Sequence, residues 1–296
     1  MNVRTEVPAR AVGGHGVSRS RGRPRALGDA SAPHVQAVER AVAIIRLLSK
    51  EVRATLKTVC ADTALPVSTA HRILETLRAH GIVDFDDRNK TWSIGVETFR
   101  VGQGYVQRVG VIDVARGVMH ELTDATGETS SIAVFDAWTL VHVSQVEAKA
   151  PIRAFIPPGT RSYLHASGIG KAVLAYLSRP IVRKHMMKGE LPRYTAQTLV
   201  TIDDLLRDLD RTRDRGWAFD NEERYLGMRC IAAPIFNAFG EVVAGVSISG
   251  PTSRLTDVRL EMLAHLVVDA ARTMTGKSGG SWVAPAVIGK GHDPRC

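Results

Sequence analysis

The feature that most constrains the fold is a succession of three helical patterns between residues 35 and 80. Apolar residues recur at intervals of three and four from Val35 to Leu48, which predicts an amphipathic helix. A second, shorter helix is expected from Leu56 to Thr63. The segment Ala64-Leu65-Pro66 breaks the pattern, because proline cannot continue a helix, and the pattern resumes from Ser68 to His80. The order helix, turn, helix predicts a helix-turn-helix unit.

A predicted β-hairpin follows the third helix. His80-Gly81 is expected to end that helix, and Ile82–Phe85 and Thr91–Ile94 have the composition of two short strands around a polar turn. This hairpin would be a wing, so residues 34–95 are expected to form a winged helix-turn-helix domain. Residues 96–109 are expected to form a linker helix.

The third helix carries the candidates for base contacts. Its apolar residues fall on one face, which leaves Ser68, Thr69, His71 and Arg72 on other faces near its N-terminal end. A recognition helix places such residues against base edges in the major groove, so these four are the expected DNA-binding residues. Arg72 could bind a guanine edge bidentately or clamp a phosphate. The alternative is an ordinary surface arginine on a structural helix.

The positive charge of the chain is concentrated toward its N-terminal end. The formal net charge is +9, and residues 1–33 contain six Arg and two acidic residues without hydrophobic periodicity, which predicts a disordered basic arm. The run that contains Arg21, Arg23 and Arg25 resembles an AT-hook, whose arginines enter a narrow minor groove. A nonspecific phosphate-binding tail is the alternative. A local excess of positive charge favours binding either to nucleic acid or to an anionic membrane surface.

A membrane partner has no other support in the sequence. No run of about 18 apolar residues occurs, and the first residues have Arg and Gly where a signal peptide needs an apolar core. Cys60, Cys230 and Cys296 lie far apart, without metal-ligand spacing or a disulfide framework. We therefore expect a cytoplasmic protein with no cofactor and no metal site.

The rest of the chain alternates helical and strand patterns, and residues 110–275 are expected to form a domain of the α+β class. Helices are predicted at Val111–Thr126, Ile169–Leu177, Arg179–Lys188, Asp203–Arg215 and Thr256–Met274. Strands are predicted at Ser130–Phe135, Thr139–Gln145, Ile152–Ile156, Trp217–Tyr225, Cys230–Phe236 and Val242–Ser249. Residues 276–296 are expected to be a flexible tail.

Two features of this domain could form a ligand site. The glycine-rich segment His165–Lys171 leads into a helix, where free backbone N–H groups favour an anion. The segment departs from a phosphate-binding loop of nucleotide hydrolases, so a small carboxylate fits it better. Asp220, Cys230, Ser247 and Ser249 lie in or beside predicted strands, and the spacing of two places both serines on one strand face. These polar groups either fix a small ligand or satisfy one another in a core.

Other classes of function have weaker signals. An enzyme acting on a small carboxylic acid would need an activated nucleophile, but no nucleophile elbow occurs and Cys230 has no visible partner base. The histidines show no spacing of metal ligands. Such an enzyme and a ligand-independent architectural DNA-binding protein remain the alternatives.

Several spaced motifs resemble one family of regulators. The segments Val35–Arg40, Leu65–Arg72 and Trp92–Gly95, and further on Gly227–Pro234 and Ser247–Pro251, resemble the IclR family over about residues 35–275. The resemblance implies a transcriptional regulator of the repressor type with a GAF-like effector-binding domain. It also implies a homodimer or homotetramer that binds a double-stranded DNA operator, whose half-sites lie about 34 to 36 Å apart.

Within the family the sequence is most similar to the members that repress the acetate operon and so control the glyoxylate bypass. This likeness implies a small organic acid as effector, similar to glyoxylate or pyruvate. The residues that it places around the effector are Gly168, Ile169, Asp220, Met228, Cys230, Ser247 and Ser249. Ile169 stands where those repressors have a smaller Ala and Met228 where they have Leu, so the pocket is expected to be narrower or more apolar.

Overall fold

The computed structural model describes residues 35–108, 111–189 and 191–284. The chain divides into two compact units, residues 1–98 and 99–296, and each is described here by itself. The expected basic arm, with Arg21, Arg23 and Arg25, lies outside the described residues. None of the helices within those ranges is long and apolar enough to cross a membrane.

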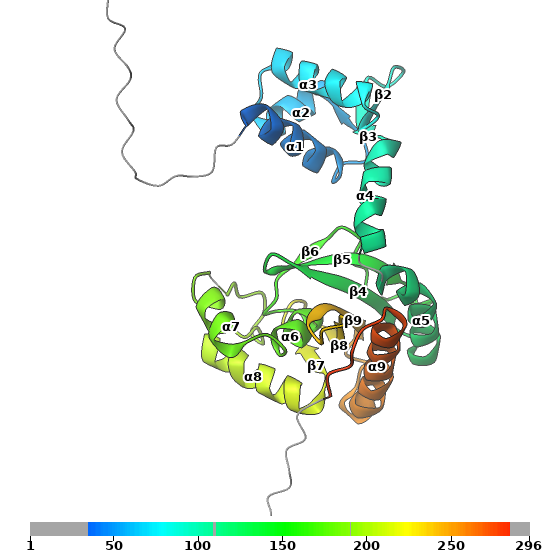
Figure 1. The fold of residues 1–296 in the computed structure, drawn as a ribbon, viewed down its shortest axis with the longest axis vertical. Helices are drawn as coiled ribbons and strands as arrows, with labels where there is room; N and C mark the ends of the chain where they lie inside the picture. Colours follow the sequence, from blue (N-terminus) through cyan, green and yellow to red (C-terminus); the bar gives the residue numbers. More distant parts are fainter. Residues whose placement is uncertain (1–34, 109–110, 190, 285–296) are drawn as a thin grey trace, which may run out of the picture. The chain divides into compact units, whose positions relative to one another are not determined.

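The first unit is a helix-turn-helix with a wing (Figure 1). Its elements are α1 (Gln36–Leu48), β1 (Ala54–Thr55), α2 (Leu56–Thr63), α3 (Val67–Ala79), β2 (Val83–Asp86) and β3 (Thr91–Ile94). The three strands form an antiparallel sheet in the order β1-β3-β2. The three predicted helices and both hairpin strands are confirmed. β1 was not predicted, because two residues are too few to show a periodicity.

Side chains from all three helices and from the wing make the core of this unit. Ile44 of α1, Val59 of α2 and Leu74 of α3 are fully buried, and Trp92 of β3 closes the core from the sheet side. The turn between α2 and α3 begins at Ala64, whose φ of 53° is left-handed and so ends α2 abruptly. Because the apolar face of α3 is used in this core, its opposite face is left to solvent.

The linker helix α4 (Val96–Arg108) begins in the first unit, and the division between the units falls after Thr98. The second unit contains α5 (Val111–Thr126), β4 (Thr129–Asp136), β5 (Thr139–Val146), β6 (Arg161–Ser162), α6 (Gly168–Leu174), α7 (Arg179–Met186), α8 (Ile202–Arg215), β7 (Ala218–Asn221), β8 (Met228–Phe236), β9 (Val242–Pro251) and α9 (Asp257–Lys277). The six strands form one antiparallel sheet in the order β6-β5-β4-β9-β8-β7, which confirms the α+β class.

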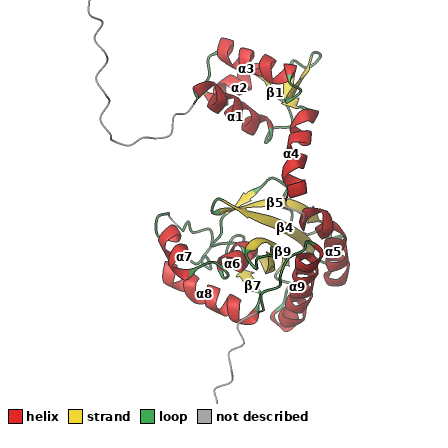
Figure 2. Cartoon of the chain, in the orientation of Figure 1, coloured by secondary structure: helices red, strands yellow, loops and turns green. Residues whose placement is uncertain are grey.

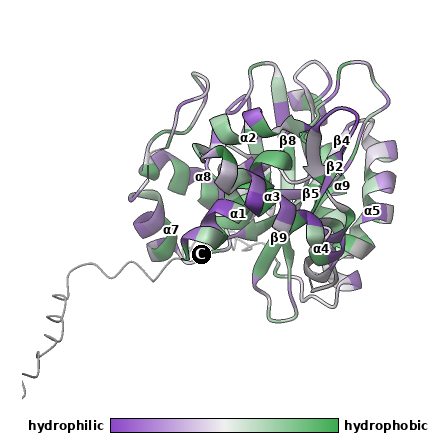
Figure 3. Ribbon diagram, turned by 90° about the horizontal axis from the view of Figure 1, so that it is seen from above, coloured by the Kyte–Doolittle hydropathy of each residue, from purple (hydrophilic) through white to green (hydrophobic). Residues whose placement is uncertain are grey.

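Helices cover both faces of this sheet (Figures 1 and 2). On the central strands successive side chains alternate between the faces, as period-2 strands require. Ile132, Val246 and Ile248 point toward α5 and α9, whereas Ala133, Ala232 and Phe236 belong to the cluster around α6 and α8. The helices are correspondingly amphipathic, with hydrophobic and hydrophilic segments side by side in Figure 3. The face that carries α6 is the one that carries the candidate ligand site.

Three predicted elements differ from the structure. Ile152–Ile156 is not a strand: its amide at Ile156 donates to the side chain of Gln145 at 2.7 Å, so the segment lies beside β5 without joining its ladder. The predicted strand Trp217–Tyr225 is reduced to β7, because Glu222 adopts a left-handed φ of 61° and turns the chain. The predicted helix Ile169–Leu177 begins one residue earlier and ends at Leu174.

The expected flexible tail is also wrong for its first part. α9 continues to Lys277, and the amide of Ser281 donates to the carbonyl of Asn237 at 2.9 Å. The indole of Trp282 packs edge-on against Phe236, with ring centroids 5.5 Å apart. A residue just before the end of the described chain is therefore part of the core around α6.

Candidate functional site

The exposed face of α3 presents the four predicted DNA-binding residues. Ser68, His71 and Arg72 are exposed and Thr69 is half-buried. His71 lies 3.9 Å from the carboxylate of Glu75 one turn later. The guanidinium of Arg72 has no ion pair or hydrogen bond to any residue in the described part of the chain, so it is available to a partner. The arrangement suits insertion of α3 into a major groove.

The tip of the wing adds a cation that the sequence prediction missed. Asp86 accepts hydrogen bonds from the amides of Arg88 and Asn89, at 2.9 and 3.2 Å, which makes the turn compact. These bonds, with the Asn89 side chain first, lower the pKa of Asp86. The turn holds Arg88 exposed at the tip. A lone Arg in a polar turn carries no sequence signal, and only the wing geometry makes it a candidate.

The second unit contains a cavity of about 260 Å³ on the α6 side of the sheet. All seven residues that the sequence placed around an effector line it: Gly168, Ile169, Asp220, Met228, Cys230, Ser247 and Ser249. They come from α6 and from strands β7, β8 and β9, which are separated by up to about 80 positions of sequence. The fold therefore brings the predicted set to one place.

Strand register explains how four of these residues meet. Asp220 on β7 is directly opposite Cys230 on β8, and Cys230 is directly opposite Ser249 on β9. These three side chains therefore form one row across the sheet. Ser247 lies two residues before Ser249, on the same strand face, and is opposite Ala232. A ladder of polar groups thus forms the floor of the cavity.

Two glycines allow α6 to approach this floor. A Cβ on Gly168 would lie 2.7 Å from the Sγ of Cys230, which is closer than real side chains come. A Cβ on Gly245 would lie 2.7 Å from Cγ2 of Ile169. The side chain of Ile169 therefore packs over a glycine of β9 and belongs to the core, while it also lines the cavity. Because Gly245 has no side chain, there is room for an isoleucine at position 169 where the sequence comparison expected a smaller alanine in related repressors.

Burial changes the pKa values of two titratable groups on the floor of the cavity. Burial raises the pKa of Asp220, although Lys171 and backbone amides oppose this shift. One such amide is that of Glu223, which donates to Asp220 at 2.8 Å. Burial raises the pKa of the Cys230 thiol to about 11. A nucleophilic thiol needs a lowered pKa, so Cys230 is suited to hydrogen bonding and not to attack.

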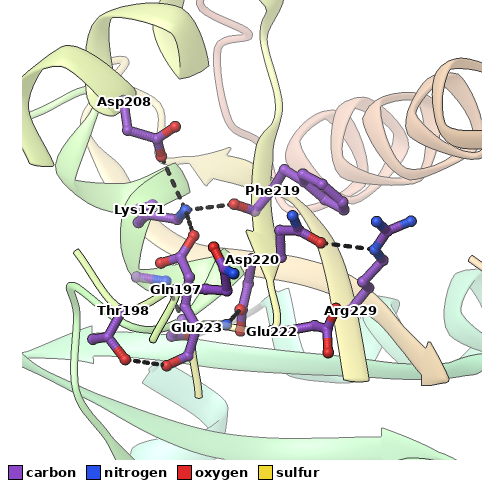
Figure 4. Close-up of polar contacts among 12 residues, drawn as sticks. Lys171, Gln197, Thr198, Asp208, Phe219, Asp220, Glu222, Glu223 and Arg229 are labelled. Carbon is purple, nitrogen blue, oxygen red and sulfur yellow. Dashed lines mark hydrogen bonds and ion pairs between the residues drawn. The ribbon is translucent and has the colours of Figure 1, made fainter. Parts of the chain in front are cut away.

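A buried cluster of charges supports the floor from behind (Figure 4). The amino group of Lys171 is completely buried and lies 2.9 Å from Asp208 of α8; it also contacts the carboxylate of Glu223 and the carbonyl of Phe219. Burial raises the pKa of Glu223 to about 7 against the opposing effect of Lys171. Lys171 is thus occupied by protein carboxylates. It is the last residue of the glycine-rich segment, yet it does not line the cavity.

A second polar wall of the cavity was not foreseen. His142 of β5 is buried, and its Nε2 lies 3.1 Å from the hydroxyl of Ser162 on β6. Burial lowers the pKa of His142 to about 4, so the imidazole is neutral at pH 7. Both residues line the cavity. In the sequence His142 is one of several scattered histidines, and only the pairing of β5 with β6 gives it a role.

Four arginines line the outer part of the cavity and differ in their partners. Arg153 is paired with Glu147 at 2.6 Å, and Arg229 with Asp257 at 2.9 Å. Arg224 lies over the ring of Tyr194, 3.7 Å from its centroid. Arg161 has no ion pair or side-chain hydrogen bond within the described ranges. Arg161 and Arg224 are therefore the cations best placed to meet an acidic ligand.

The chemistry of these sites is that of binding. In the described part of the chain no group of three or more His, Cys, Asp or Glu side chains could hold a metal ion. The cavity offers hydroxyls, a protonated thiol, a carboxyl with a raised pKa and a neutral imidazole, next to unpaired cationic side chains. Such a set can hydrogen-bond a small polar molecule and balance a negative charge.

Comparison with known proteins places both units. The family model "IclR helix-turn-helix domain" matches residues 37–87, and the model "Bacterial transcriptional regulator IclR C-terminal" matches residues 103–275. The chain is 42% identical to the HTH-type transcriptional regulator BhcR of Paracoccus denitrificans, over 87% of this chain and 94% of the relative. It is 37% identical to the HTH-type transcriptional repressor AllR of Escherichia coli strain K12, over 88% and 97% of the two chains.

A solved structure agrees with these relatives. The crystal structure of the Thermotoga maritima IclR protein is 26% identical to this chain and superposes with a TM-score of 0.70, covering 83% of this chain and 100% of that protein. These relatives are transcriptional regulators, which excludes the enzyme alternative at the level of the family. The chain belongs to the IclR family of DNA-binding bacterial transcriptional regulators.

Proposed function

We propose that this regulator is a repressor whose operator binding is modulated by a small organic acid. In the proposal Ser68, Thr69, His71 and Arg72 of α3 read the major groove, and Arg21, Arg23 and Arg25 add a minor-groove contact. Gly168, Ile169, Asp220, Met228, Cys230, Ser247 and Ser249 hold the effector. The effector changes DNA affinity by binding one arrangement of the protein more tightly than another, since only differential affinity can shift a population.

The observation that supports this most strongly is the single cavity that all seven effector candidates line. Its volume of about 260 Å³ lies just below the range for drug-sized ligands, which begins at roughly 300 Å³, so it suits a small metabolite. Unpaired Arg161 and the stacked Arg224 at its outer part would balance a carboxylate. The carboxyl group of Asp220 on its floor, whose pKa is raised by burial, would hydrogen-bond a polar group of the effector.

For the identity of the effector, the motifs of the sequence favour a 2-oxo acid such as glyoxylate or pyruvate. They also favour a relationship to repressors of the acetate operon, which stays a prediction. Ile169 separates this chain from that group, but its packing over Gly245 leaves room for a two- or three-carbon acid. The name of the relative AllR supports repression over activation.

The oligomeric state and location complete the proposal. An operator with two half-sites about 34 Å apart requires two copies of α3, so we propose a homodimer or a pair of dimers. We propose that the protein acts in the cytoplasm. Residues 34–95 would be the DNA-binding domain, 96–109 the linker and 110–275 the effector-binding domain. This last domain would be GAF-like.

The DNA-binding half is tested by Arg72→Ala. The operator would first be isolated by selecting random duplexes with the parent protein. The variant should lose about 1 to 3 kcal/mol of specific operator affinity, measured by fluorescence anisotropy at fixed salt. Arg46→Ala, another exposed arginine of the same unit but on α1, is the matched control and should bind as the parent does. Unchanged affinity for the Arg72 variant would refute the assignment of α3.

The effector half is tested by Ser247→Ala in calorimetric titrations with glyoxylate and with pyruvate. The variant should bind more weakly by about fivefold to tenfold, which corresponds to one lost hydrogen bond, and should bind the operator normally in the absence of ligand. Ser253→Ala, at an exposed position outside the cavity, is the control. An architectural protein would show operator affinity that neither acid alters. Turnover of either acid would instead support an enzyme.

A further inference from the structure

A second and larger cavity, of about 610 Å³, lies next to the first one in the same unit. The turn between β4 and β5 contributes Trp138, β6 contributes Arg161, α7 contributes His185, and the turn after α7 contributes Lys188. None of the seven effector candidates lines it. The two cavities share Arg161, Ser162 and Tyr163, so the segment at β6 is a common wall.

In the described part of its lining, this second cavity carries basic side chains. Arg161, His165, His185 and Lys188 line it, and no Asp or Glu occurs among the described residues of its lining. Arg161 and Lys188 are exposed and have no ion pair or side-chain hydrogen bond within the described residues. Glu190 lies outside those residues. Unpaired cations that converge on a concave surface raise the local concentration of anions.

These two cations differ from several arginines of the unit, which are paired with carboxylates. Arg153, Arg183 and Arg229 are each within 3 Å of a carboxylate. His165 does not add to the charge, because burial lowers its pKa and its Nε2 donates to the carbonyl of Pro192 at 3.1 Å. Recognition of a negative charge would therefore rest on Arg161 and Lys188.

Trp138 forms an aromatic wall of the cavity and has an unusual, left-handed backbone conformation. Ala137 and Trp138 form the turn of the β4–β5 hairpin, with φ of 45° and 63°, where Asn and Gly are normally found. A bulky residue with a left-handed φ is an outlier, and such strain persists mainly at ligand sites. The indole stacks on the imidazole of His185, with centroids 3.8 Å apart and planes 9° apart. The indole also meets the ring of Phe135 edge to face, with ring centroids 5.8 Å apart, so two neighbouring rings hold it in place.

We propose that this cavity is a second ligand site, which takes an organic anion that carries an aromatic ring. Its volume lies within the range of sites for such molecules. Arg161 and Lys188 would pair with the carboxylate or phosphate group, and the ring would pack against Trp138 and Tyr163. The proposal does not depend on the identity of the effector in the first cavity, but both sites would use Arg161 of the common wall.

The experiment is a calorimetric titration of the full-length protein with benzoate and with phenyl phosphate, which combine a ring with a carboxylate or a phosphate. Acetate and inorganic phosphate test the anion alone, and benzyl alcohol tests the ring alone. Both ring-bearing anions should bind, and more tightly than any of these three partial probes. The stronger of the two identifies which acidic group the site prefers.

Three variants locate the binding. Lys188→Gln should weaken it about tenfold, the effect of losing one charge-assisted hydrogen bond. Lys184→Gln is the matched control, because Lys184 is an exposed lysine of α7 that does not line the cavity, and it should bind as the parent does. Ser247→Ala removes a group of the first cavity only and should also leave the affinity unchanged.

Equal affinity in Lys188→Gln and the parent would overturn the proposal, and so would the absence of binding by both ring-bearing anions at millimolar concentration. A loss of binding in Ser247→Ala would assign the ligand to the first cavity and would overturn it as well. Trp138→Leu provides a further readout: the advantage of benzoate over acetate should disappear, and an advantage that stays as large as in the parent would show that the ring does not pack against Trp138 and would overturn the proposed aromatic wall. Circular dichroism checks that each variant is folded.

Discussion

The proposed DNA-binding surface and the proposed effector site present their side chains in opposite ways. On α3 the side chains of Ser68, His71 and Arg72 stand in solvent. In the effector cavity Asp220 and Ser249 are buried, and Lys171 behind them is completely enclosed. The residues proposed to bind DNA lie on the exposed face of α3, outside the core of the first unit. The residues proposed to bind the effector are part of the buried interior of the second unit.

This difference predicts how function and stability are coupled. Substitution of an exposed residue on α3 removes a contact to DNA and leaves the packing of Ile44, Leu74 and Trp92 intact. Substitution behind the effector cavity leaves charged groups buried without partners, which costs far more than an exposed pair is worth. Mutations that abolish effector response should often lower stability, and mutations that abolish DNA binding should not.

The largest expected effect comes from Lys171→Met, which keeps the volume but removes the charge. Glu223 and Asp208 would be left without their cation, and loss of one partner from a buried ion pair costs about 3 to 5 kcal/mol. The measurement is denaturant unfolding of the second unit at pH 7.5. Lys149→Met is the control, since Lys149 pairs with Asp124 at 3.6 Å on the surface and should change stability by less than about 0.5 kcal/mol. Similar stability of the two variants would contradict the distinction between the sites.

A smaller, pH-dependent effect is expected from Glu223→Gln. Burial raises the pKa of Glu223 from 4.5 to about 7, so the folded state holds a proton that the unfolded state has released. Its stabilising contribution is present below pH 4.5 and is lost as the pH rises through 7. Gln cannot ionise. The parent and the variant should have similar unfolding free energies at pH 5, and the variant should be more stable by on the order of 2 kcal/mol at pH 8.

The unfolding free energy of the variant must be compared with that of the parent at each pH, because His142 changes the stability of both proteins with pH in the direction opposite to Glu223. Its lowered pKa, about 4, makes stability rise with pH between 4 and 6.5, which hides the effect of Glu223 in the parent alone. If the difference in unfolding free energy between parent and variant stays constant from pH 5 to pH 8, Glu223 is ionised throughout this range. The buried cluster would then be a fully charged one.

The smallest effect is expected at the wing. Arg88→Ala should change the unfolding free energy by less than about 0.5 kcal/mol, because the side chain is exposed. If Arg88 touches a phosphate, operator affinity should fall equally for selected and scrambled duplexes, and the slope of log affinity against log salt should decrease by about 1. A loss confined to the selected sequence would instead make Arg88 a base-reading residue.

The same contrast explains what could be predicted from the sequence. The helix-turn-helix depends on local periodicity and on breakers such as Pro66, so its elements were predicted almost to the residue. The shared face of Ser247 and Ser249 also follows from a local rule, the period of two. The strand expected at Ile152–Ile156 was wrong, because its apolar residues meet a side chain of β5 instead of a backbone ladder.

Other parts of the effector site depend on pairings that no local pattern contains. The row of Asp220, Cys230 and Ser249 exists because of the register of three strands. Lys171 ends the glycine-rich segment whose free backbone N–H groups favour an anion, but its own amino group is enclosed by carboxylates 37 and 52 residues later. His142 acquires its place from the two-residue strand β6, which is too short to be predicted.

The thiol on the cavity floor also limits what this protein can sense. With its pKa raised to about 11, Cys230 is almost entirely un-ionised at neutral pH, and oxidants and alkylating agents react with the thiolate form. Oxidation of Cys230 should therefore be slow at peroxide concentrations that inactivate redox-responsive repressors. Cys230 would instead serve as a slowly reacting accessibility probe. The rate at which an alkylating agent labels it would report how often the cavity is empty and open.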